Sequence, residues 1–237
     1  MKFIEVFSTW QGEGPDAGKR MLLCRFKTCD RRCYYCDTIV KMRSSVESEY
    51  SIEQLQKVID EEKCGLMITG GEPTFESNID DTITLVKELK VHGPINIETN
   101  GFGVKDLIGI FYDFGTITNF ARNFPSIILS PKIFTEEDLT FYKDIINYVE
   151  VVNNTIIHFP YYKLVYTYND VKINNYNDMF LQYLMENSKM EPNRRVYLMP
   201  EGKTKEELIK TSPIVFDKCE EWKVNFSSRE HIIYGFI

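Results

Sequence analysis

Residues 66–89, LMITGGEPTFESNIDDTITLVKEL, contain the unit that decides the fold. Leu66–Thr69 is a short apolar run that predicts a buried strand, and Ile79–Leu89 has the apolar spacing of a helix. Gly70-Gly71-Glu72-Pro73 separates the two and is typical of a turn. A strand that passes through a turn into a helix is the basic unit of a parallel α/β sheet.

Strand-like and helix-like segments alternate along the rest of the chain, in units of about 30 residues. The predicted strands are Phe3–Phe7, Met21–Phe26, Leu66–Thr69, Ile95–Glu98, Ile127–Leu129, Lys163–Thr167, Arg195–Met199 and Lys223–Phe226. The predicted helices are Ile52–Glu62, Ile79–Leu89, Val104–Phe111, Thr135–Tyr148, Asn177–Glu186 and one that Thr204 opens and Pro213 interrupts. About six strands follow one another through helices, fewer than the eight of a full barrel.

The pattern therefore predicts an α/β fold, an incomplete (β/α) barrel of about six parallel strands, with a doubly wound open sheet as the alternative. In either fold the active site lies at the C-terminal ends of the strands. We expect residues 1–237 to form a single domain. The Tyr- and Asn-rich stretch 148–176 is expected to be an irregular elaboration on one side.

Composition narrows the classes of function. The net charge is −7 and the pI is near 5.2, which disfavours binding of nucleic acid through a broad phosphate-contacting face. The sequence has no apolar run long enough for a transmembrane helix, and its N-terminal residues lack the apolar core of a signal peptide. We therefore expect a cytoplasmic protein.

Three of the six cysteines, Cys29, Cys33 and Cys36, fall within eight residues with the spacing C-x3-C-x2-C. Thiolates bind soft metals, and one loop can wrap one cluster. Three ligands are one short of a closed zinc site and one short of a fully ligated iron–sulfur cubane, which would leave one iron open. Zinc with a fourth ligand from elsewhere, or three unliganded thiols, are the alternatives.

The cysteine spacing, with Tyr35 before the last cysteine and Gly70-Gly71-Glu72-Pro73 after the next strand, resembles the radical S-adenosylmethionine superfamily. The resemblance implies a radical SAM core fold, a [4Fe-4S] cluster on the three cysteines, and S-adenosylmethionine bound to the open iron. In that superfamily the reduced cluster splits the sulfonium, and a 5′-deoxyadenosyl radical removes a substrate hydrogen. The two glycines would let the backbone approach the methionine end, because they lack Cβ.

A further ordered set of motifs resembles the 7-carboxy-7-deazaguanine synthases. The motifs are Trp10-Gln11-Gly12-Glu13-Gly14, Arg25 four residues before Cys29, Cys36-Asp37-Thr38, Glu98-Thr99-Asn100-Gly101, Ser130-Pro131-Lys132, Met199-Pro200-Glu201-Gly202 and His231. The resemblance implies conversion of 6-carboxy-5,6,7,8-tetrahydropterin to 7-carboxy-7-deazaguanine with loss of ammonia, in 7-deazapurine biosynthesis. It also implies Mg²⁺, a homodimer, and a flavodoxin or ferredoxin-type electron donor, to which Arg31 and Arg32 would be complementary in charge.

The resemblance assigns roles to individual positions. The expected substrate-binding residues are Trp10, Gln11, Gly12, Glu13, Arg25, Thr99, His231 and the carboxylate of Ile237, with His231 also the candidate for proton transfer. The expected S-adenosylmethionine-binding residues are Tyr35, Cys36, Asp37, Gly70, Gly71, Glu72, Pro73, Gly101, Ser130, Pro131, Lys132, Met199, Pro200 and Glu201. Thr38 is the expected magnesium ligand, because a hydroxyl is a hard oxygen donor.

Two other functions are compatible with parts of the pattern. A glycyl-radical activase would share the cluster and the Gly-Gly-Glu-Pro turn but act on a protein partner. A non-enzymatic iron–sulfur or zinc-binding module would need the cysteines alone. His92 and His158 belong to no motif and are expected to be structural, and Cys24, Cys64 and Cys219 are expected to be buried in the core.

Overall fold

The computed structural model describes residues 1–113, 124–153 and 160–236. The chain divides into two compact units. The first consists of Met1–Gln11, Asp16–Ile128 and the C-terminal Phe236, and the second of Gly12–Pro15 and Leu129–Gly235. The expectation of a single domain over residues 1–237 stays a prediction.

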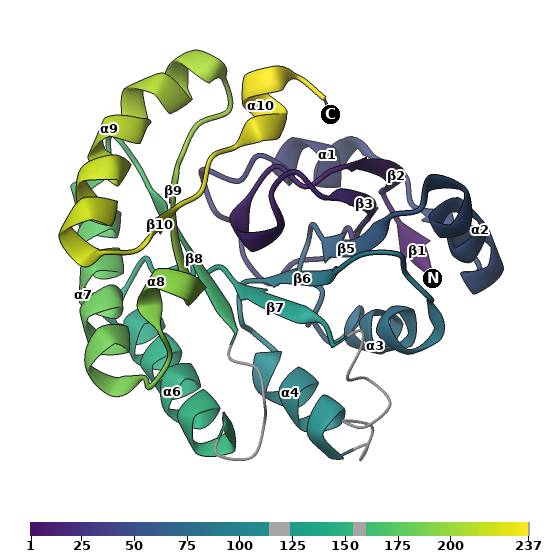
Figure 1. Cartoon of the computed structure of the whole chain (residues 1–237), viewed down its shortest axis with the longest axis horizontal. Coiled ribbons are helices and arrows are strands. Elements are labelled where there is room, and N and C mark those ends of the chain that lie inside the picture. The colour runs from purple at the N-terminus through teal and green to yellow at the C-terminus, as the bar shows by residue number, and fades with distance from the viewer. Residues whose placement is uncertain (114–123, 154–159, 237) are drawn as a thin grey trace. The chain divides into compact units, whose positions relative to one another are not determined.

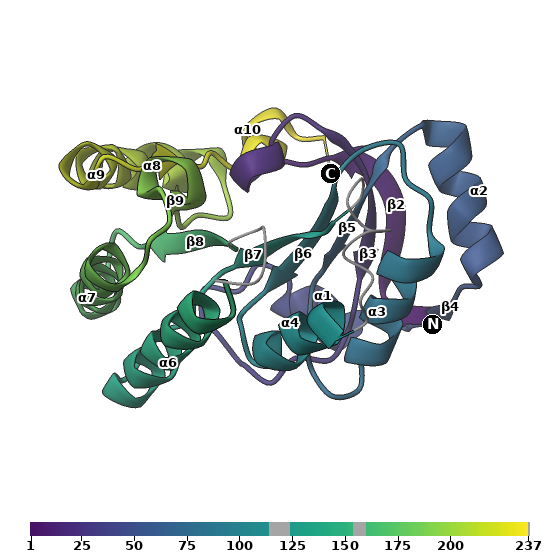
Figure 2. The same cartoon turned by 60° about the horizontal axis from the view of Figure 1, so that its bottom comes forward.

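The first unit is built on a mixed sheet with the strand order β7-β6-β5-β3-β2. β3 pairs in parallel with β5 and β5 with β6, whereas β2 is antiparallel to β3. The strands are β2 (Glu5–Trp10), β3 (Arg20–Arg25), β5 (Gly65–Thr69), β6 (Ile95–Thr99) and β7 (Ser126–Leu129), with a separate pair β1 (Lys2–Phe3) and β4 (Ser48–Glu49). The helices are α1 (Ile39–Ser44), α2 (Ile52–Glu62), α3 (Ile79–Glu88) and α4 (Val104–Asp113), and α2 and α3 lie on one side of the sheet (Figures 1 and 2).

The second unit repeats the pattern with parallel strands in the order β10-β9-β8. The strands are β8 (Tyr161–Tyr166), β9 (Val196–Pro200) and β10 (Asn225–Phe226). The helices are α6 (Glu136–Asn153), α7 (Val171–Asn187), α8 (Pro192–Arg195), α9 (Lys205–Trp222) and α10 (Glu230–Tyr234), and a short 3-10 turn, Gly14–Asp16, lies at the boundary of the units. The α/β class with mostly parallel strands is confirmed.

Helix starts follow from local side-chain chemistry. Ser51 accepts a hydrogen bond from the Gln54 amide while the Gln54 side chain bonds the Ser51 amide, so α2 begins with a capping box. Thr204 and Glu207 form the same arrangement at the start of α9. The expected interruption at Pro213 is wrong, because α9 continues to Trp222. Proline lacks the amide that would donate to the Ile209 carbonyl, but Leu208, Thr211, Val215 and Cys219 are buried on both sides of it, and this packing stabilises the helix through Pro213.

The structure also differs from the expectation for residues 148–176. Residues 148–153 belong to α6, 161–166 form β8 and 171–176 begin α7, whereas 154–159 lie outside the described residues. Two tyrosines of this stretch are core residues, because Tyr162 and Tyr166 are at most 1% exposed, whereas Tyr168 is 45% exposed. An aromatic ring with a hydroxyl can fill a core when the hydroxyl finds a partner, as Tyr166 does in Asp178.

On one face of the sheet of the first unit, a buried apolar cluster is followed along β3 by a candidate site residue. Met21, Leu23 and Met67 form a buried cluster against Phe7 on one face of the sheet. Arg25 follows Leu23 by two residues, so it emerges on the same face at the C-terminal end of β3.

In the described part of the chain, no helix has the length and apolar character required to cross a membrane.

Candidate functional site

The three clustered cysteines lie on the loop that follows β3. None of the three is in a disulfide, and the Cys36 amide donates to the Cys33 carbonyl (3.2 Å) while the Arg31 amide donates to Cys29 Sγ (3.4 Å). Burial raises the pKa of the Cys29 thiol to about 12. Three soft sulfur donors on one short loop fit an iron–sulfur cluster with one iron left open, and an iron centre would replace the thiol protons.

The Gly-Gly-Glu-Pro turn holds the start of this loop. The Glu72 amide donates to the Thr28 carbonyl (2.7 Å), and Asn78 Nδ2 donates to the same oxygen (3.2 Å). Gly71 has φ +51°, and a Cβ there would collide with the Thr28 carbonyl. A glycine is therefore required at position 71 for the turn to pack against the residue before Cys29.

Glu72 is buried, 1% exposed, and saturated by neutral donors. Its Oε1 accepts from the Thr74 amide (2.9 Å), the Thr74 hydroxyl (2.7 Å) and the Thr99 hydroxyl (2.5 Å), and its Oε2 accepts from the Asn100 amide (2.6 Å). Burial raises the pKa of Glu72 despite these bonds. The carboxylate thus joins the end of β5 to the end of β6.

Thr99 and Gly101, two positions expected near the substrate and cofactor, are part of this network. The Gly101 amide donates to Thr99 Oγ1 (2.9 Å), and Gly101 has φ +98°. Pro73 accepts at its carbonyl from the Thr82 hydroxyl (2.8 Å). These contacts fix the backbone at the C-terminal ends of β5 and β6.

Arg25, the expected clamp for a substrate carboxylate, has a carboxylate partner within the chain. Its Nε donates to Glu5 Oε2 (2.6 Å) and its Nη1 to Thr38 Oγ1 (3.2 Å). Burial opposes ionisation of Glu5, but Lys41 and Arg25 lower its pKa. Thr38 in turn donates to Asp37 Oδ1 (2.9 Å), so two hard oxygen donors lie next to each other at the expected magnesium position.

Gly70 has a structural role in the placement of Arg25. Its φ is +61°, and a Cβ there would collide with the Cγ of Arg25. Gly70 was expected to admit the methionine end of the cofactor. The structure supplies a second reason for a glycine, which is the passage of the arginine side chain over the turn.

The two positions before Gly12 differ in exposure. Gln11 is 3% exposed, and its Nε2 donates to Oε1 of Glu98 (2.9 Å), a residue of β6. Trp10 is 46% exposed with the Arg20 guanidinium 5.8 Å from its ring centroid. Tyr35 contacts the ring of Tyr34 edge to face.

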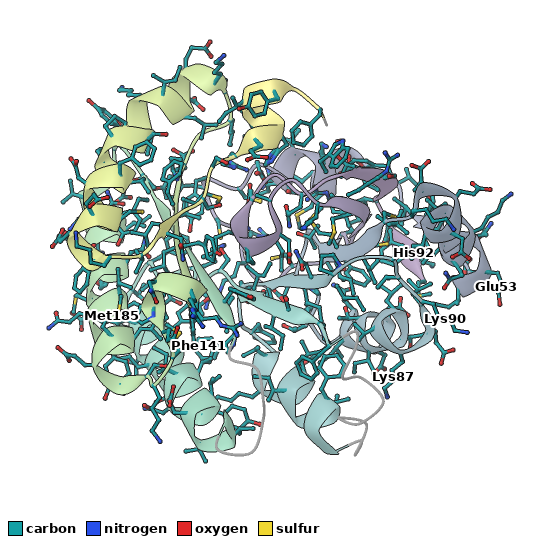
Figure 3. The ribbon with its side chains drawn as sticks, viewed as in Figure 1. Glu53, Lys87, Lys90, His92, Phe141 and Met185 are labelled. Atoms are coloured by element: carbon teal, nitrogen blue, oxygen red, sulfur yellow. The ribbon has the colours of Figure 1, made fainter. Side chains whose placement is uncertain are left out.

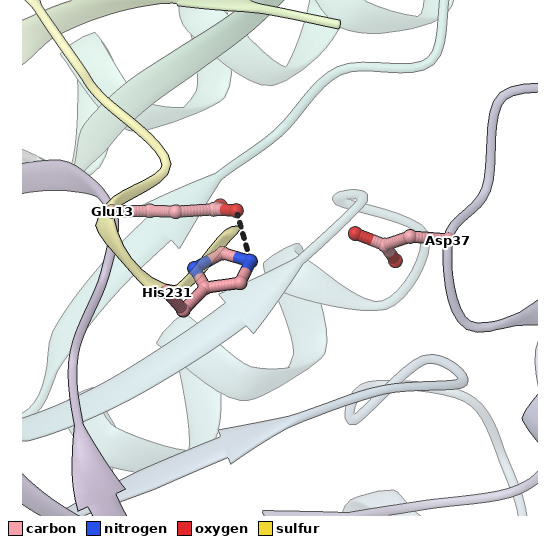
Figure 4. Close-up of side chains that lie close together, drawn as sticks. All are labelled: Glu13, Asp37 and His231. Atoms are coloured by element: carbon pink, nitrogen blue, oxygen red, sulfur yellow. Dashed lines mark ion pairs between the residues drawn. The ribbon is translucent and has the colours of Figure 1, made fainter. Parts of the chain in front are cut away.

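In the second unit, Glu13 lies in a cluster of cations. Its Oε2 accepts from Lys163 Nζ (2.7 Å), its Oε1 accepts from Arg229 Nε (2.9 Å), and His231 Nε2 lies 3.7 Å from Oε1 (Figure 4). The Lys163 and Arg229 side chains are 4% and 7% exposed. Burial would raise the pKa of Glu13, but the three cationic or basic neighbours outweigh it and hold the pKa far below its usual range.

Gly12 explains how His231 approaches this cluster. A Cβ on Gly12 would collide with the imidazole of His231, and the Gly12 carbonyl accepts from the Glu230 amide (3.0 Å). The backbone of Gly12 therefore packs directly against the His231 side chain at the start of α10. Ile237, expected to offer its carboxylate to the substrate, lies outside the described residues.

The remaining expected cofactor residues of the second unit follow β7 and end β9. Lys132 Nζ donates to the Ser130 carbonyl (2.8 Å) and hydroxyl (2.6 Å), next to Pro131. Met199 and Pro200 are buried, and the Glu201 amide donates to the Tyr166 carbonyl (2.8 Å). Burial and the nearby Glu207 raise the pKa of Glu201.

The structure thus gathers the predicted residues into two sets, one in each unit. The first set is Trp10, Gln11, Arg25, Cys29, Cys33, Tyr35, Cys36, Asp37, Thr38, Gly70, Gly71, Glu72, Pro73, Thr99 and Gly101. The second set is Gly12, Glu13, Ser130, Pro131, Lys132, Met199, Pro200, Glu201 and His231. The ligand contacts assigned to these residues stay predictions.

Sequence reasoning missed several partners in both sets. Lys163 and Arg229 had no motif, although a lysine inside the apolar run Tyr162–Tyr166 signals a buried charge that needs a counterion. Asn100 stood inside a quoted motif without a role. His92 was expected to be structural, and it lies at the surface with Nε2 3.1 Å from Asp60 (Figure 3).

Comparison with known proteins extends the match beyond these motifs. The family described as the radical SAM superfamily matches residues 24–179. A 7-carboxy-7-deazaguanine synthase of Thermoplasma acidophilum is 37% identical over 103 residues, which cover 43% of this chain and 47% of the relative. The synthase of Methanothermobacter thermautotrophicus is 30% identical over 158 residues, 63% of this chain and 62% of that protein. The chain thus spans about half the length of the first relative and under two thirds of the second.

The fold has a solved counterpart. The crystal structure of QueE from Escherichia coli superposes with a TM-score of 0.53 at 17% identity and covers 97% of this chain and 94% of that one. The likeness confirms the predicted radical SAM core, an incomplete barrel. The family match spans more than half of the chain and includes the three cysteines and the Gly-Gly-Glu-Pro turn, and therefore the chain belongs to the radical SAM superfamily.

Proposed function

We propose that this chain is a lyase that converts 6-carboxy-5,6,7,8-tetrahydropterin to 7-carboxy-7-deazaguanine, with release of ammonia. The observation that carries the proposal is the loop of three cysteines outside any disulfide, fixed by the Gly-Gly-Glu-Pro turn, in a chain whose curated relatives bear the name of this synthase. The product of this reaction would be an intermediate of 7-deazapurine biosynthesis.

Cys29, Cys33 and Cys36 would hold the [4Fe-4S] cluster, and the Gly70–Pro73 turn with Gly101 would border the S-adenosylmethionine that membership in the superfamily implies. When bound, the two cofactors supply a radical that removes a hydrogen atom from the substrate. The work of the chain is to hold the substrate in one orientation and to exclude water from it.

Arg25 is the proposed partner of the substrate carboxylate. A guanidinium binds a carboxylate with two parallel hydrogen bonds. Glu5 already pairs with Arg25 Nε (2.6 Å), so an incoming carboxylate competes with Glu5 for the same cation. Substrate affinity would therefore depend on how readily Glu5 transfers to Lys41, which bonds its Oε1 at 2.8 Å.

His231 is the proposed proton carrier for the loss of ammonia, because the departing nitrogen must be protonated. The Glu13 carboxylate lies 3.7 Å from His231 Nε2, so a negative charge is placed beside the imidazole. Glu13 is itself held by Lys163 and Arg229, so its orientation does not depend on the substrate.

Mg²⁺ would take Thr38 Oγ1, with Asp37 as the adjacent hard donor. The Arg25 guanidinium lies 3.2 Å from Thr38 Oγ1, and a bound dication would repel it. Magnesium binding and the orientation of Arg25 are therefore coupled in this proposal.

A flavodoxin or ferredoxin-type protein is the proposed electron donor, and Arg31 and Arg32 its contact. Such donors are acidic, and Arg32 is exposed in the cluster loop. The double variant Arg31→Glu/Arg32→Glu should slow reduction by flavodoxin but not by dithionite, whereas Arg194→Glu, an exposed arginine of α8, should change neither. Equal loss with both reductants would contradict the assignment. The homodimer and the cytoplasmic location stay predictions.

The decisive experiment is an anaerobic assay of the reconstituted protein. The reduced enzyme is mixed with S-adenosylmethionine, Mg²⁺ and 6-carboxytetrahydropterin, and products are followed by mass spectrometry. We expect 7-carboxy-7-deazaguanine from the native chain and from Cys64→Ala, a buried cysteine outside the loop, but not from Cys33→Ala.

Other outcomes discriminate the alternatives. Formation of 5′-deoxyadenosine without deazaguanine would reject the substrate and favour an activase that needs a protein partner. Absence of both products from protein with a full complement of iron and sulfide would reject the enzymatic proposal.

A further inference from the structure

We propose that Asn100 is a positioning residue for the iron–sulfur cluster, which it serves by tying the residue after Cys29 to the buried carboxylate of Glu72. The proposal concerns the geometry of the cluster loop, and it depends on the superfamily's cluster rather than on the identity of the substrate.

Both neighbours of Cys29 in the chain are held from outside the cluster loop. On one side, the Thr28 carbonyl accepts from the Glu72 amide (2.7 Å) and from Asn78 Nδ2 (3.2 Å). On the other side, Asp30 Oδ1 accepts from Asn100 Nδ2 (2.7 Å). The Cα position of the first cluster cysteine is therefore fixed between two supports that belong to the ends of β5 and β6.

Asn100 can make this contact in one orientation only. Its Oδ1 accepts from the Phe102 amide (2.9 Å), so the amide nitrogen is the atom that faces Asp30. The Asn100 backbone amide donates to Glu72 Oε2 (2.6 Å), and the residue is 7% exposed. Backbone and side chain are thus both fixed before any cofactor is bound.

Glu72 serves as the common anchor of the two supports. Its own backbone amide holds Thr28, and its carboxylate holds the backbone of Asn100. Because the carboxylate is buried and accepts four hydrogen bonds within the chain, its effect on the cluster passes through Asn100 and Thr28. The glutamate of the Gly-Gly-Glu-Pro turn is in this sense a frame for the cysteine loop.

The test is a reversal of the donor and the acceptor. Asn100→Asp keeps the acceptor for Phe102 but places a carboxylate against Asp30, and Asp30→Asn keeps an acceptor for Asn100. The double variant Asn100→Asp/Asp30→Asn restores one donor and one acceptor with their positions exchanged. Asp30→Ala removes the acceptor without repulsion, and Asn187→Asp, an exposed residue of α7, is the matched control.

The measurements are iron and sulfide content, the electron paramagnetic resonance spectrum of the reduced cluster with and without S-adenosylmethionine, and the dissociation constant of S-adenosylmethionine. We expect Asn100→Asp to alter the spectrum and to raise the dissociation constant by about tenfold, because like charges at hydrogen-bond distance repel. Asp30→Ala should shift the spectrum in the same way as Asn100→Asp does. The spectrum of Asp30→Asn should stay close to that of the native chain, and the spectrum of the double variant should return towards it. None of these measurements uses the pterin, so they stand even if the proposed reaction fails.

The proposal is overturned if Asn100→Asp and Asp30→Ala both keep the native spectrum and affinity. It is also overturned if the double variant has the same spectrum and the same dissociation constant as Asn100→Asp, provided that the apoproteins of both variants unfold at the same temperature as the control variant. If Asn100→Asp does not fold, Asp30→Ala and the double variant give the same decision.

Discussion

Glu72 and Glu13 are two largely desolvated glutamates of the described chain that are stabilised in opposite ways. Glu72, in the first unit, accepts hydrogen bonds from hydroxyls and backbone amides, and burial raises its pKa. Glu13, in the second unit, has a side chain that is 12% exposed and that lies against Lys163, Arg229 and His231, and its pKa is held far below the usual range.

The difference shows what each carboxylate contributes. Neutral donors give direction but little charge compensation, so Glu72 serves to fix the turns after β5 and β6. Cations give charge compensation, so Glu13 permits two basic side chains to be buried beside a histidine. The role of a glutamate in a sequence motif therefore depends on whether its partners in the fold are neutral donors or cations.

The largest effect is expected for Glu13→Gln. The change leaves Lys163 and Arg229 buried without their counterion, and breaking a buried ion pair in this way costs about 3–5 kcal/mol of stability. Urea-induced unfolding of the apoprotein measures the loss.

The second step is Glu13→Gln/Lys163→Met, which removes one cation together with the acid. It should recover part of the lost stability, because one unpaired buried charge remains instead of two. A double variant less stable than Glu13→Gln would show that the charges are not what stabilises this cluster.

A pair of glycines offers a comparison of comparable size. Gly70→Ala should destabilise by about 2–4 kcal/mol, because a Cβ at φ +61° is strained and also collides with Arg25. Gly14→Ala is the matched control, since Gly14 has φ +70° but nothing within 4 Å of the added Cβ, and should cost about 1–2 kcal/mol. Equal losses in thermal unfolding would mean that Arg25 moves aside without strain.

A smaller effect is expected for Glu72→Gln. One acceptor oxygen becomes a donor that faces hydroxyl and amide donors, which costs about 1–3 kcal/mol. Hydrogen exchange should localise the effect, with faster exchange at the amides of Thr74 and Asn100 and unchanged exchange at the Ile173 amide, which Asp170 caps in α7. Faster exchange at all three positions would indicate global rather than local opening.

These two regions also show how far sequence reasoning reaches. The capping box of α2 was predictable because Ser51 and Gln54 are three residues apart, and the Gly-Gly-Glu-Pro turn because strand, turn and helix are contiguous. The Glu13–Lys163 pair was not, because its members are 150 residues apart and only the folded chain brings them together. Pro213 was misjudged because the tertiary packing of α9 on both sides of it outweighs one missing helix hydrogen bond, and no local pattern contains that packing.

The contrast between the two glutamates predicts opposite responses to pH. Glu13 has a folded pKa below its ordinary value of 4.5, so its stabilisation is present above that pH and is lost as the pH falls below it. Glu72 has a folded pKa above 4.5, so the native state holds its proton more tightly than the unfolded chain and loses stability as the pH rises from 4.5 towards the folded value. The uptake or release of one proton on unfolding changes the free energy of unfolding by at most about 1.4 kcal/mol per pH unit.

Unfolding of the native chain, Glu13→Gln and Glu72→Gln at several pH values from 3 to 7 separates the two contributions. The stability advantage of the native chain over Glu13→Gln should shrink towards acid pH, because below pH 4.5 the unfolded chain takes up a proton at Glu13 while the folded chain does not. The advantage over Glu72→Gln should instead be greatest at acid pH, where protonated Glu72 avoids the desolvation of a charge. Parallel curves for the two variants would mean that hydrogen bonds and cations stabilise these acids equally, and the distinction between the two regions would then fail.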